Sequence, residues 1–192
     1  MNQKRIIIGV TGGSGTIYGI RMLEKLRSLG VETHLVISEW GEKTLKVETS
    51  YSANDLKQLA DFYYFNDNLA APISSGSFKT DGMIIAPCSM RSLAEIATGV
   101  TSDLITRSAD VMLKEKKKLI LLARESPLNL VHIRNMEAVT LAGGVICPPV
   151  PAFYNKPENI NDIVDHTVGR VLDLLGLNPD WVKRWGKSVN KT

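Results

Sequence analysis

Short apolar runs alternate along this chain with longer segments in which apolar residues recur every three or four positions. The runs of strand length are Arg5–Val10, Thr33–Ile37, Gly82–Ala86, Lys118–Ala123 and the shorter Val145–Cys147. Apolar runs of this length, with little polar alternation, are typical of strands buried on both faces of a parallel sheet.

Segments with helical periodicity lie between these runs. They predict helices at Thr16–Leu29, Glu39–Val47, near Ser92–Thr98, near Leu128–Ala142 and at Ile160–Leu175. Strands that alternate with helices predict an α/β fold of three layers, a Rossmann-like or flavodoxin-like parallel sheet with helices on both faces. No repeat, linker or low-complexity segment divides the chain, so we expect one domain over residues 1–192, with a C-terminal tail at about 178–192.

The residues that follow the predicted strands are unusually rich in Gly, Ser, Arg and Pro. They are Thr11–Gly15, Ser38, Pro87–Ser92, Arg124–Pro127 and Pro148–Pro151. In open α/β sheets, ligands bind outside the carboxyl ends of the strands. The sequence therefore predicts a binding site at this edge.

The turn Gly12–Gly15 joins the first strand to the first helix, an arrangement in which backbone N–H groups often meet a phosphate. Its spacing lacks the G-x-G-x-x-G of a dinucleotide site and the Lys-Ser/Thr ending of a P-loop. A mononucleotide such as FMN fits better than NAD or ATP. A turn that uses glycine for tightness alone is the alternative.

Two further strand ends carry candidate ligands. Pro87–Ser92 offers two hydroxyls and a cation to a phosphate, although Ser89 taken alone is better explained as a helix N-cap. Arg124-Glu125 follows a buried strand and indicates a ligand role, with a structural ion pair as the alternative. The long loop Asp67–Thr80 is either functional or disordered, and the proline-rich Pro148–Pro157 either walls a site or connects elements.

Composition narrows the function classes. The net charge of +3 and the scattered basic residues give no reason to expect nucleic-acid binding. The N-terminus reads neither as a signal peptide nor as a membrane span, and two cysteines beside prolines suit buried free thiols, so a cytoplasmic protein is expected.

Several chemistries are disfavoured by what the sequence lacks. The three histidines lack metal-ligand spacing, no nucleophile elbow is present, and no Asp-rich motif could hold a diphosphate through Mg²⁺. We therefore expect no metal. Any phosphate must be held by Arg, Lys, hydroxyl and backbone donors.

Motifs along almost the whole chain carry a family resemblance. They are Thr11–Gly15 with Tyr18-Gly19, Ser74–Ser77, Pro87–Ser89, Arg107 through Lys114 to Glu115, Arg124–Leu128, Asn135-Met136, Pro148–Tyr154 and Arg184-Trp185-Gly186. In their order and spacing, the chain from about residue 4 to 186 resembles the UbiX-like flavin prenyltransferases, a family that includes one component of phenolic-acid decarboxylase systems.

The resemblance implies an activity. Members of that family transfer a dimethylallyl group from dimethylallyl phosphate to N5 of reduced FMN, and a second bond to C6 closes a fourth ring. The prenylated FMN then serves UbiD-type decarboxylases. Members commonly form homododecamers and bind FMN between protomers. Because the flavin is itself prenylated, the resemblance implies that FMN is a substrate here and that the decarboxylase is the recipient of the product.

The resemblance also implies residue roles. FMN would contact Gly12, Gly13, Ser14, Ser38, Ser89, Met90, Arg91, Ser92 and Arg124. Dimethylallyl phosphate would contact Tyr154, Arg170 and, beside the prenyl group, Trp185, with Arg107 and Lys114 as further cations. Glu48, Ser75 and Glu125 match polar active-site positions. Gly13 departs from the family, where alanine is usual, and this small change should leave FMN binding intact.

Two other interpretations stay open. A flavin-dependent cysteine decarboxylase would share the fold, but its early histidine and its P-x-M-N-x-x-M-W motif are wanting here, because Arg134 precedes Asn135-Met136. A non-catalytic FMN-binding partner of a decarboxylase is the second, and the set Arg107, Lys114, Arg170 and Tyr154 argues against it.

Overall fold

The computed structural model describes residues 3–182 and 184, in two compact units, residues 1–148 and 149–192. The first unit contains a six-stranded sheet in which every neighbouring pair of strands is parallel. Its strands are β1 (Arg5–Val10), β2 (Glu32–Ile37), β3 (Phe62–Phe65), β4 (Gly82–Cys88), β5 (Lys118–Ala123) and β6 (Val145–Ile146).

The strands lie in the order β3-β2-β1-β4-β5-β6. From β1, the chain first adds β2 and β3 on one side of the sheet. It then crosses back to add β4, β5 and β6 on the other side. This is the strand order of the Rossmann fold, in which the crevice between the first and fourth strands is the topological switch point.

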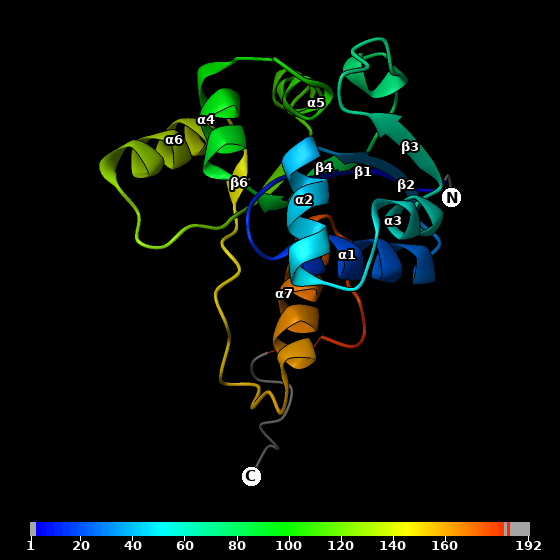
Figure 1. Ribbon diagram of the computed structural model, residues 1–192, viewed down its shortest axis with the longest axis vertical. Coiled ribbons are helices and arrows are strands. Elements are labelled where there is room, and N and C mark those ends of the chain that lie inside the picture. The colour runs from blue at the N-terminus through cyan, green and yellow to red at the C-terminus, as the bar shows by residue number, and fades with distance from the viewer. Residues whose placement is uncertain (1–2, 183, 185–192) are drawn as a thin grey trace. The chain divides into compact units, whose positions relative to one another are not determined.

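Helices cover both faces of this sheet (Figure 1). One face carries α1 (Thr16–Ser28), with α2 (Glu39–Glu48) and α3 (Ala53–Leu59) packed beside it. The other carries α4 (Met90–Thr98) and α5 (Leu104–Lys114), and α6 (Leu130–Leu141) packs on α4. The predicted α/β fold with a parallel sheet between two helical layers is confirmed.

The core explains why the strands are recognisable in the sequence. All seven residues of β4 are buried, and so are the last five of β1, β2 and β5. Strands covered by helices on both faces need apolar side chains at every position, which is the pattern that the sequence has.

Three elements of the first unit escape the sequence pattern. The strand β3 is a four-residue edge strand of aromatic residues, two of them exposed, and α3 has seven residues. The helix α5 is longer, and its N-terminus does carry a recognisable signal, a capping box between Asp103 and Thr106. The loop Asp67–Thr80 contains a short 3₁₀ helix, Pro72–Ser74, whose Ile73 is buried.

The second unit is built on α7 (Ile160–Leu174), which begins with a capping box between Asn159 and Asp162. Its buried face includes Val164, Val168, Val171 and Leu172. The chain then folds back along the helix: a side chain at Gly169 would have its Cβ only 2.1 Å from Val182 Cγ2, and Val182 is buried. Apolar packing therefore fixes this returning segment on α7.

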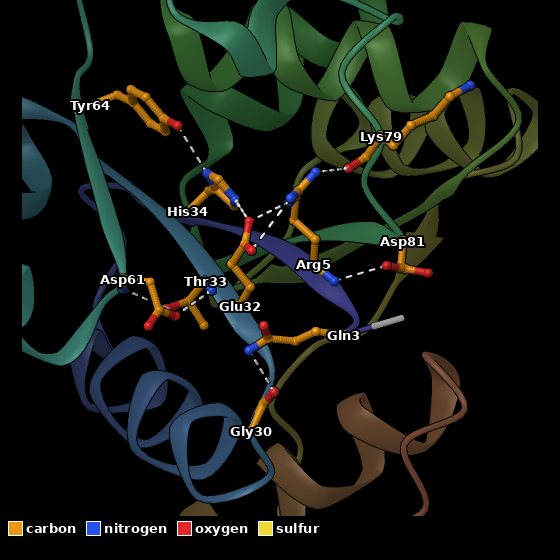
Figure 2. Close-up of polar contacts among 10 residues, drawn as sticks. All are labelled: Gln3, Arg5, Gly30, Glu32, Thr33, His34, Asp61, Tyr64, Lys79 and Asp81. Atoms are coloured by element: carbon orange, nitrogen blue, oxygen red, sulfur yellow. Dashed lines mark hydrogen bonds and ion pairs between the residues drawn. The ribbon is translucent and has the colours of Figure 1, made fainter. Parts of the chain in front are cut away.

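A dense polar network lies at the amino ends of the central strands (Figure 2). The Glu32 carboxylate accepts hydrogen bonds from the Arg5 guanidinium and, over 2.8 Å, pairs with His34 Nε2. His34 Nδ1 lies 3.0 Å from the Tyr64 hydroxyl, and its ring stacks on Phe62 at 4.8 Å between centroids. The buried imidazole therefore has a polar partner at both nitrogens.

Candidate active site

The carboxyl ends of β1 and β4 are joined at the switch point by one side chain. The Thr11 hydroxyl donates to the Pro87 carbonyl over 2.8 Å and accepts from the Ser89 N–H over 2.8 Å. The Thr11 N–H also donates to the Pro87 carbonyl. The two loops that leave these strands are therefore held against each other.

The start of α1 already has an anion in place. The Glu48 carboxylate accepts hydrogen bonds from the N–H groups of Gly15 and Thr16 and from the Thr16 hydroxyl, at distances of 2.9–3.1 Å. Burial would raise the pKa of Glu48, but these bonds and one from Ser14 outweigh it, so that the pKa is lowered. The N–H groups that the sequence suggested for a phosphate have a carboxylate from α2 as their acceptor.

The turn itself needs glycine at two of its positions. Gly15 has φ of +104°, which disfavours any other residue. A Cβ at Gly12 would lie 2.6 Å from Trp40 Cβ, so α2 approaches the turn too closely for a side chain. At Gly13, the nearest heavy atom to a new Cβ is 3.4 Å away, which is ordinary contact. An alanine would therefore fit there.

A cleft of about 350 Å³ opens beside these loops. Its lining includes five predicted FMN-binding residues, Gly12, Ser38, Ser89, Arg91 and Ser92. These come from the ends of three neighbouring strands and from the first turn of α4. The structure therefore brings these five predicted residues together at the switch point, where a ligand of this fold is expected.

Two of the serines in the cleft have structural duties as well. Ser38 Oγ accepts from the Gly41 N–H at the start of α2, and Ser89 Oγ accepts from the Ser92 N–H at the start of α4. Each is therefore an N-cap, as the sequence allowed for Ser89. Arg91 is held through Nε by Glu95 at 2.9 Å, while 72% of its side chain stays exposed.

Other residues of the cleft were not predicted. Trp40 stands with 60% of its area exposed, and Lys43 Nζ lies 4.4 Å from its ring centroid. Asn66 follows β3 and binds Asp103 at the start of α5 through Nδ2 at 2.9 Å. Trp40 could have been found from its place two residues after Ser38. Asn66 could not, because no apolar run marks β3.

A second cluster of predicted residues lies along α5 and the loop before β4. Arg107 Nε donates to the Ser74 carbonyl over 3.2 Å, and its Nη1 pairs with Asp110 at 2.8 Å. Lys114 Nζ pairs with Glu115 at 2.5 Å, directly beside Gly76. Ser75 bonds Ser77 in the same loop. Ser75, Arg107 and Lys114 are therefore brought together around one loop, outside the lining of the cleft.

The remaining predicted residues belong to neither cluster. Arg124 and Glu125 are exposed just after β5, where the Arg124 N–H donates to the Cys88 carbonyl. In the second unit, the Tyr154 hydroxyl lies 3.1 Å from His166 Nε2 and Arg170 pairs with Asp173. Met90 begins α4. Trp185 falls outside the described residues.

The described part of the chain shows neither a reactive thiol at Cys88 nor a metal centre. Burial raises the pKa of the Cys88 thiol to about 12, so it stays protonated. Within residues 3–182 and 184, no group of three or more His, Cys, Asp or Glu side chains could hold a metal ion. No helix in that part of the chain is long and apolar enough to cross a membrane.

Comparison with known proteins gives consistent results. The Flavoprotein family matches residues 1–172. A probable UbiX-like flavin prenyltransferase of Bacillus subtilis is 54% identical, over 94% of this chain and 89% of its own. The crystal structure of AnUbiX (PadA1) in complex with FMN and dimethylallyl pyrophosphate is 52% identical with a TM-score of 0.95, covering 96% of this chain and 98% of that one.

Another solved relative bears on assembly. A dodecameric FMN-dependent UbiX-like decarboxylase from Escherichia coli O157:H7 is 50% identical with a TM-score of 0.92, over 94% of this chain and 98% of its own. The FMN-dependent cysteine decarboxylase TvaF, by contrast, is 16% identical with a TM-score of 0.62, a likeness of fold alone. With a switch-point cleft and near full-length similarity at about half identity, the chain belongs to the UbiX-like flavin prenyltransferases.

Proposed function

We propose that this enzyme transfers the dimethylallyl group of dimethylallyl phosphate to N5 and then C6 of reduced FMN, without a metal. The product, prenylated FMN, would be released to a UbiD-type decarboxylase. The observation that carries the proposal is the similarity, with a TM-score of 0.95, to a structure that contains both FMN and a dimethylallyl donor. The cleft at the switch point also supports it, because five of the residues that the resemblance assigns to FMN line it.

FMN would lie along the carboxyl edge of the sheet. Hydroxyls of Ser38, Ser89 and Ser92 and the Arg91 guanidinium suit the phosphate and ribityl oxygens. The glycine turn would allow the flavin close approach to the backbone at Gly12, Gly13 and Ser14, and Arg124 and Met90 would complete the site. Because Glu48 already caps α1, we assign the flavin phosphate to the loop before α4.

The prenyl donor requires stabilisation of charge in two places. As the C1–O bond breaks, its electron pair leaves with the phosphate, and Arg107, Lys114, Arg170 and the Tyr154 hydroxyl would stabilise that negative charge. The allyl fragment becomes positive and would lie between the flavin and the aromatic Trp185. The flavin supplies the nucleophilic N5, and the protein orients the two reactants.

The second bond requires a base. When C6 is alkylated, its proton must leave to restore the aromatic ring, and Glu125 or the released phosphate would accept it. Ser75 and Glu48 are polar groups that would orient the donor and the turn. Glu125 is exposed at the end of β5 and bonds its neighbour's N–H, so its carboxylate is available in the isolated chain.

We propose that several copies of the chain, in a homododecamer, complete the site. Two observations support this. The cluster of Ser75, Arg107 and Lys114 lies outside the lining of the cleft, and the helix α6 is apolar on most sides. On α6, Leu130, Val131, Ile133 and Leu141 are each more than half exposed. A helix of this kind is normally covered. Leu130→Asp with Ile133→Asp should lower the molar mass in light scattering; an unchanged mass would remove α6 from the interface.

An anaerobic reaction tests the function. The protein is incubated with reduced FMN and dimethylallyl phosphate, and the flavin is analysed by mass spectrometry for the gain of one C5H8 unit. A parallel reaction with dimethylallyl diphosphate decides which donor is accepted. Unmodified FMN in both would overturn the proposal and favour a non-catalytic FMN-binding protein. Glu125→Gln should keep FMN binding and slow product formation, whereas wild-type turnover would exclude Glu125 from the mechanism.

A further inference from the structure

In the second unit, one buried carboxylate holds two arginines. Asp173 Oδ2 accepts from Arg170 Nη1 at 2.8 Å and from Arg184 Nη1 at 2.5 Å, and its Oδ1 accepts from Arg184 Nη2 at 2.7 Å. Only 8% of the Asp173 side chain is exposed. The Arg184 hydrogen bonds outweigh burial and hold the pKa of Asp173 below its usual range. The carboxylate is therefore ionised at neutral pH.

The two arginines come from different segments of the unit. Arg170 lies one helical turn before Asp173 on α7, whereas Arg184 lies at the end of the segment that returns along this helix. Arg184 Nη2 also donates to the Pro179 carbonyl, and Val182 packs where Gly169 leaves room. An apolar contact and an ionic contact thus attach the same segment to the helix, immediately before Trp185.

The charges of this trio are not balanced. Two guanidinium groups and one carboxylate leave one positive charge, and two like charges lie at a single oxygen atom. Half of the Arg170 side chain is exposed, and its contact with Asp173 is made through Nη1, while a guanidinium has five N–H donors. Arg170 is therefore fixed on one side and open on the other, where a phosphate dianion would complete the neutralisation.

We infer that Asp173 is a positioning residue for the prenyl donor, because it fixes the Arg170 guanidinium and is itself held by Arg184 of the returning segment. The inference rests on the proposed function, which gives Arg170 its role at the donor. Pre-orienting a side chain reduces the ordering that substrate binding must impose, so that its loss weakens binding of the donor. The affinity for the flavin, which is held elsewhere, should not change.

Steady-state kinetics of Asp173→Asn tests this role. Asparagine keeps the shape but removes the charge. We expect the KM for dimethylallyl phosphate to rise about tenfold, with kcat within about twofold and the KM for FMN unchanged, since one charge-assisted contact is lost. Glu158→Gln removes an exposed carboxylate from the same unit and should change neither constant. Equal increases in both KM values, or none, would overturn the inference.

A double-mutant cycle separates positioning from a general structural role. If Asp173 acts through Arg170, Asp173→Asn should add little to the KM of Arg170→Gln, whereas independent effects would multiply. Arg184→Gln keeps the carboxylate but frees the returning segment, and we expect the KM for the donor to rise about threefold. Arg184→Gln also tests the inference if Asp173→Asn does not fold. An unchanged KM in Arg184→Gln would remove the segment from the inference.

The two proposals fail in different ways. If the wild-type protein makes no prenylated FMN, the proposed function fails and the role of Asp173 falls with it. If the wild-type protein is active and Asp173→Asn has a wild-type KM for the donor, the function stands and only the inference is overturned.

Discussion

The two edges of the same sheet use polar residues in opposite ways. At the amino edge, Arg5, Glu32, His34 and Tyr64 form a chain of contacts in which each group is the partner of the next (Figure 2). At the carboxyl edge, serines and Arg91 surround a cleft of about 350 Å³. Charged side chains occur at both edges, so charge alone does not distinguish the site.

The difference shows what identifies a site in this fold. A polar group that is bonded only to other protein groups stabilises the chain, whereas hydroxyls and a guanidinium arranged around open space can bind a ligand. The carboxyl edge has internal contacts too, but they bind loops and helix starts, as Thr11 and Glu48 do. Substitutions at the two edges should therefore affect different quantities.

The largest change is expected from Glu32→Gln at the amino edge. The substitution removes the charge that accepts from Arg5 and His34, and should lower the free energy of unfolding by about 2 kcal/mol. FMN affinity should not change. Urea unfolding at fixed protein concentration and an FMN fluorescence titration measure the two quantities. Glu39→Gln, which breaks an exposed pair with Lys43, is the stability control. A weaker FMN affinity in Glu32→Gln would contradict the division of the edges.

Glu48→Gln should act at the carboxyl edge and be smaller. The carboxylate satisfies two N–H groups and a hydroxyl at the start of α1, so we expect a loss of about 1.5 kcal/mol in unfolding free energy. Unlike Glu32→Gln, it should also weaken FMN binding, because the glycine turn loses its support. Glu42→Gln on the same helix is a control. FMN affinity equal to wild type would mean that the turn does not need this cap.

Lowering the pH should reduce the free energy of unfolding through the buried imidazole of His34. Burial lowers the pKa of His34 below 6.5, although Glu32 opposes the shift, so the unfolded chain takes up a proton that the folded protein does not. This contribution is present above about pH 6.5 and is lost as the pH falls through the folded pKa. We expect a loss of about 1 kcal/mol between pH 7 and 5.5. His34→Gln should flatten the profile in this range; a profile as steep as wild type would assign the effect elsewhere.

The smallest expected change is a gain. Gly13→Ala should raise the unfolding free energy by about 0.5 kcal/mol, because the new Cβ meets nothing closer than 3.4 Å and the unfolded chain loses freedom. FMN affinity should be retained. Gly12→Ala, one residue earlier, would collide with Trp40 and should lower both stability and FMN affinity. Similar behaviour of the two variants would mean that the turn is looser than the structure indicates.

The sequence predicts the buried half of the fold better than its rim. The strands β1, β4 and β5 are recognisable in the sequence because helices cover both of their faces, and β1 and β5 have the predicted bounds. The edge strand β3 pairs on one side only and alternates exposed and half-buried aromatics, so no apolar run marks it. The helix α5 carries both a capping box at Asp103 and buried apolar residues at helical spacing, such as Ile105, Ala109 and Met112, so it could have been predicted from its sequence.

The lining of the cleft was predictable where it lies close to the end of a predicted strand. Gly12, Ser38 and Ser89 lie within three residues of such ends, and parallel strands bring their ends to one edge. Glu48 was assigned only by resemblance, since no local pattern indicates that the end of α2 reaches the start of α1. Asp173 carried no signal either, because two of its three contacts come from a residue eleven positions later.

The Thr11 hydroxyl, which bridges the Pro87 carbonyl and the Ser89 N–H, connects the loops on the two sides of the switch point before any ligand binds. A nucleotide that contacts both loops therefore binds a preformed surface. Its association rate is not limited by a rearrangement of the loops. Valine at this position would nearly preserve the volume and remove both hydroxyl bonds, leaving the backbone bond to the Pro87 carbonyl. We then expect a lower association rate constant for FMN and an unchanged dissociation rate constant. Stopped-flow fluorescence measures the two separately.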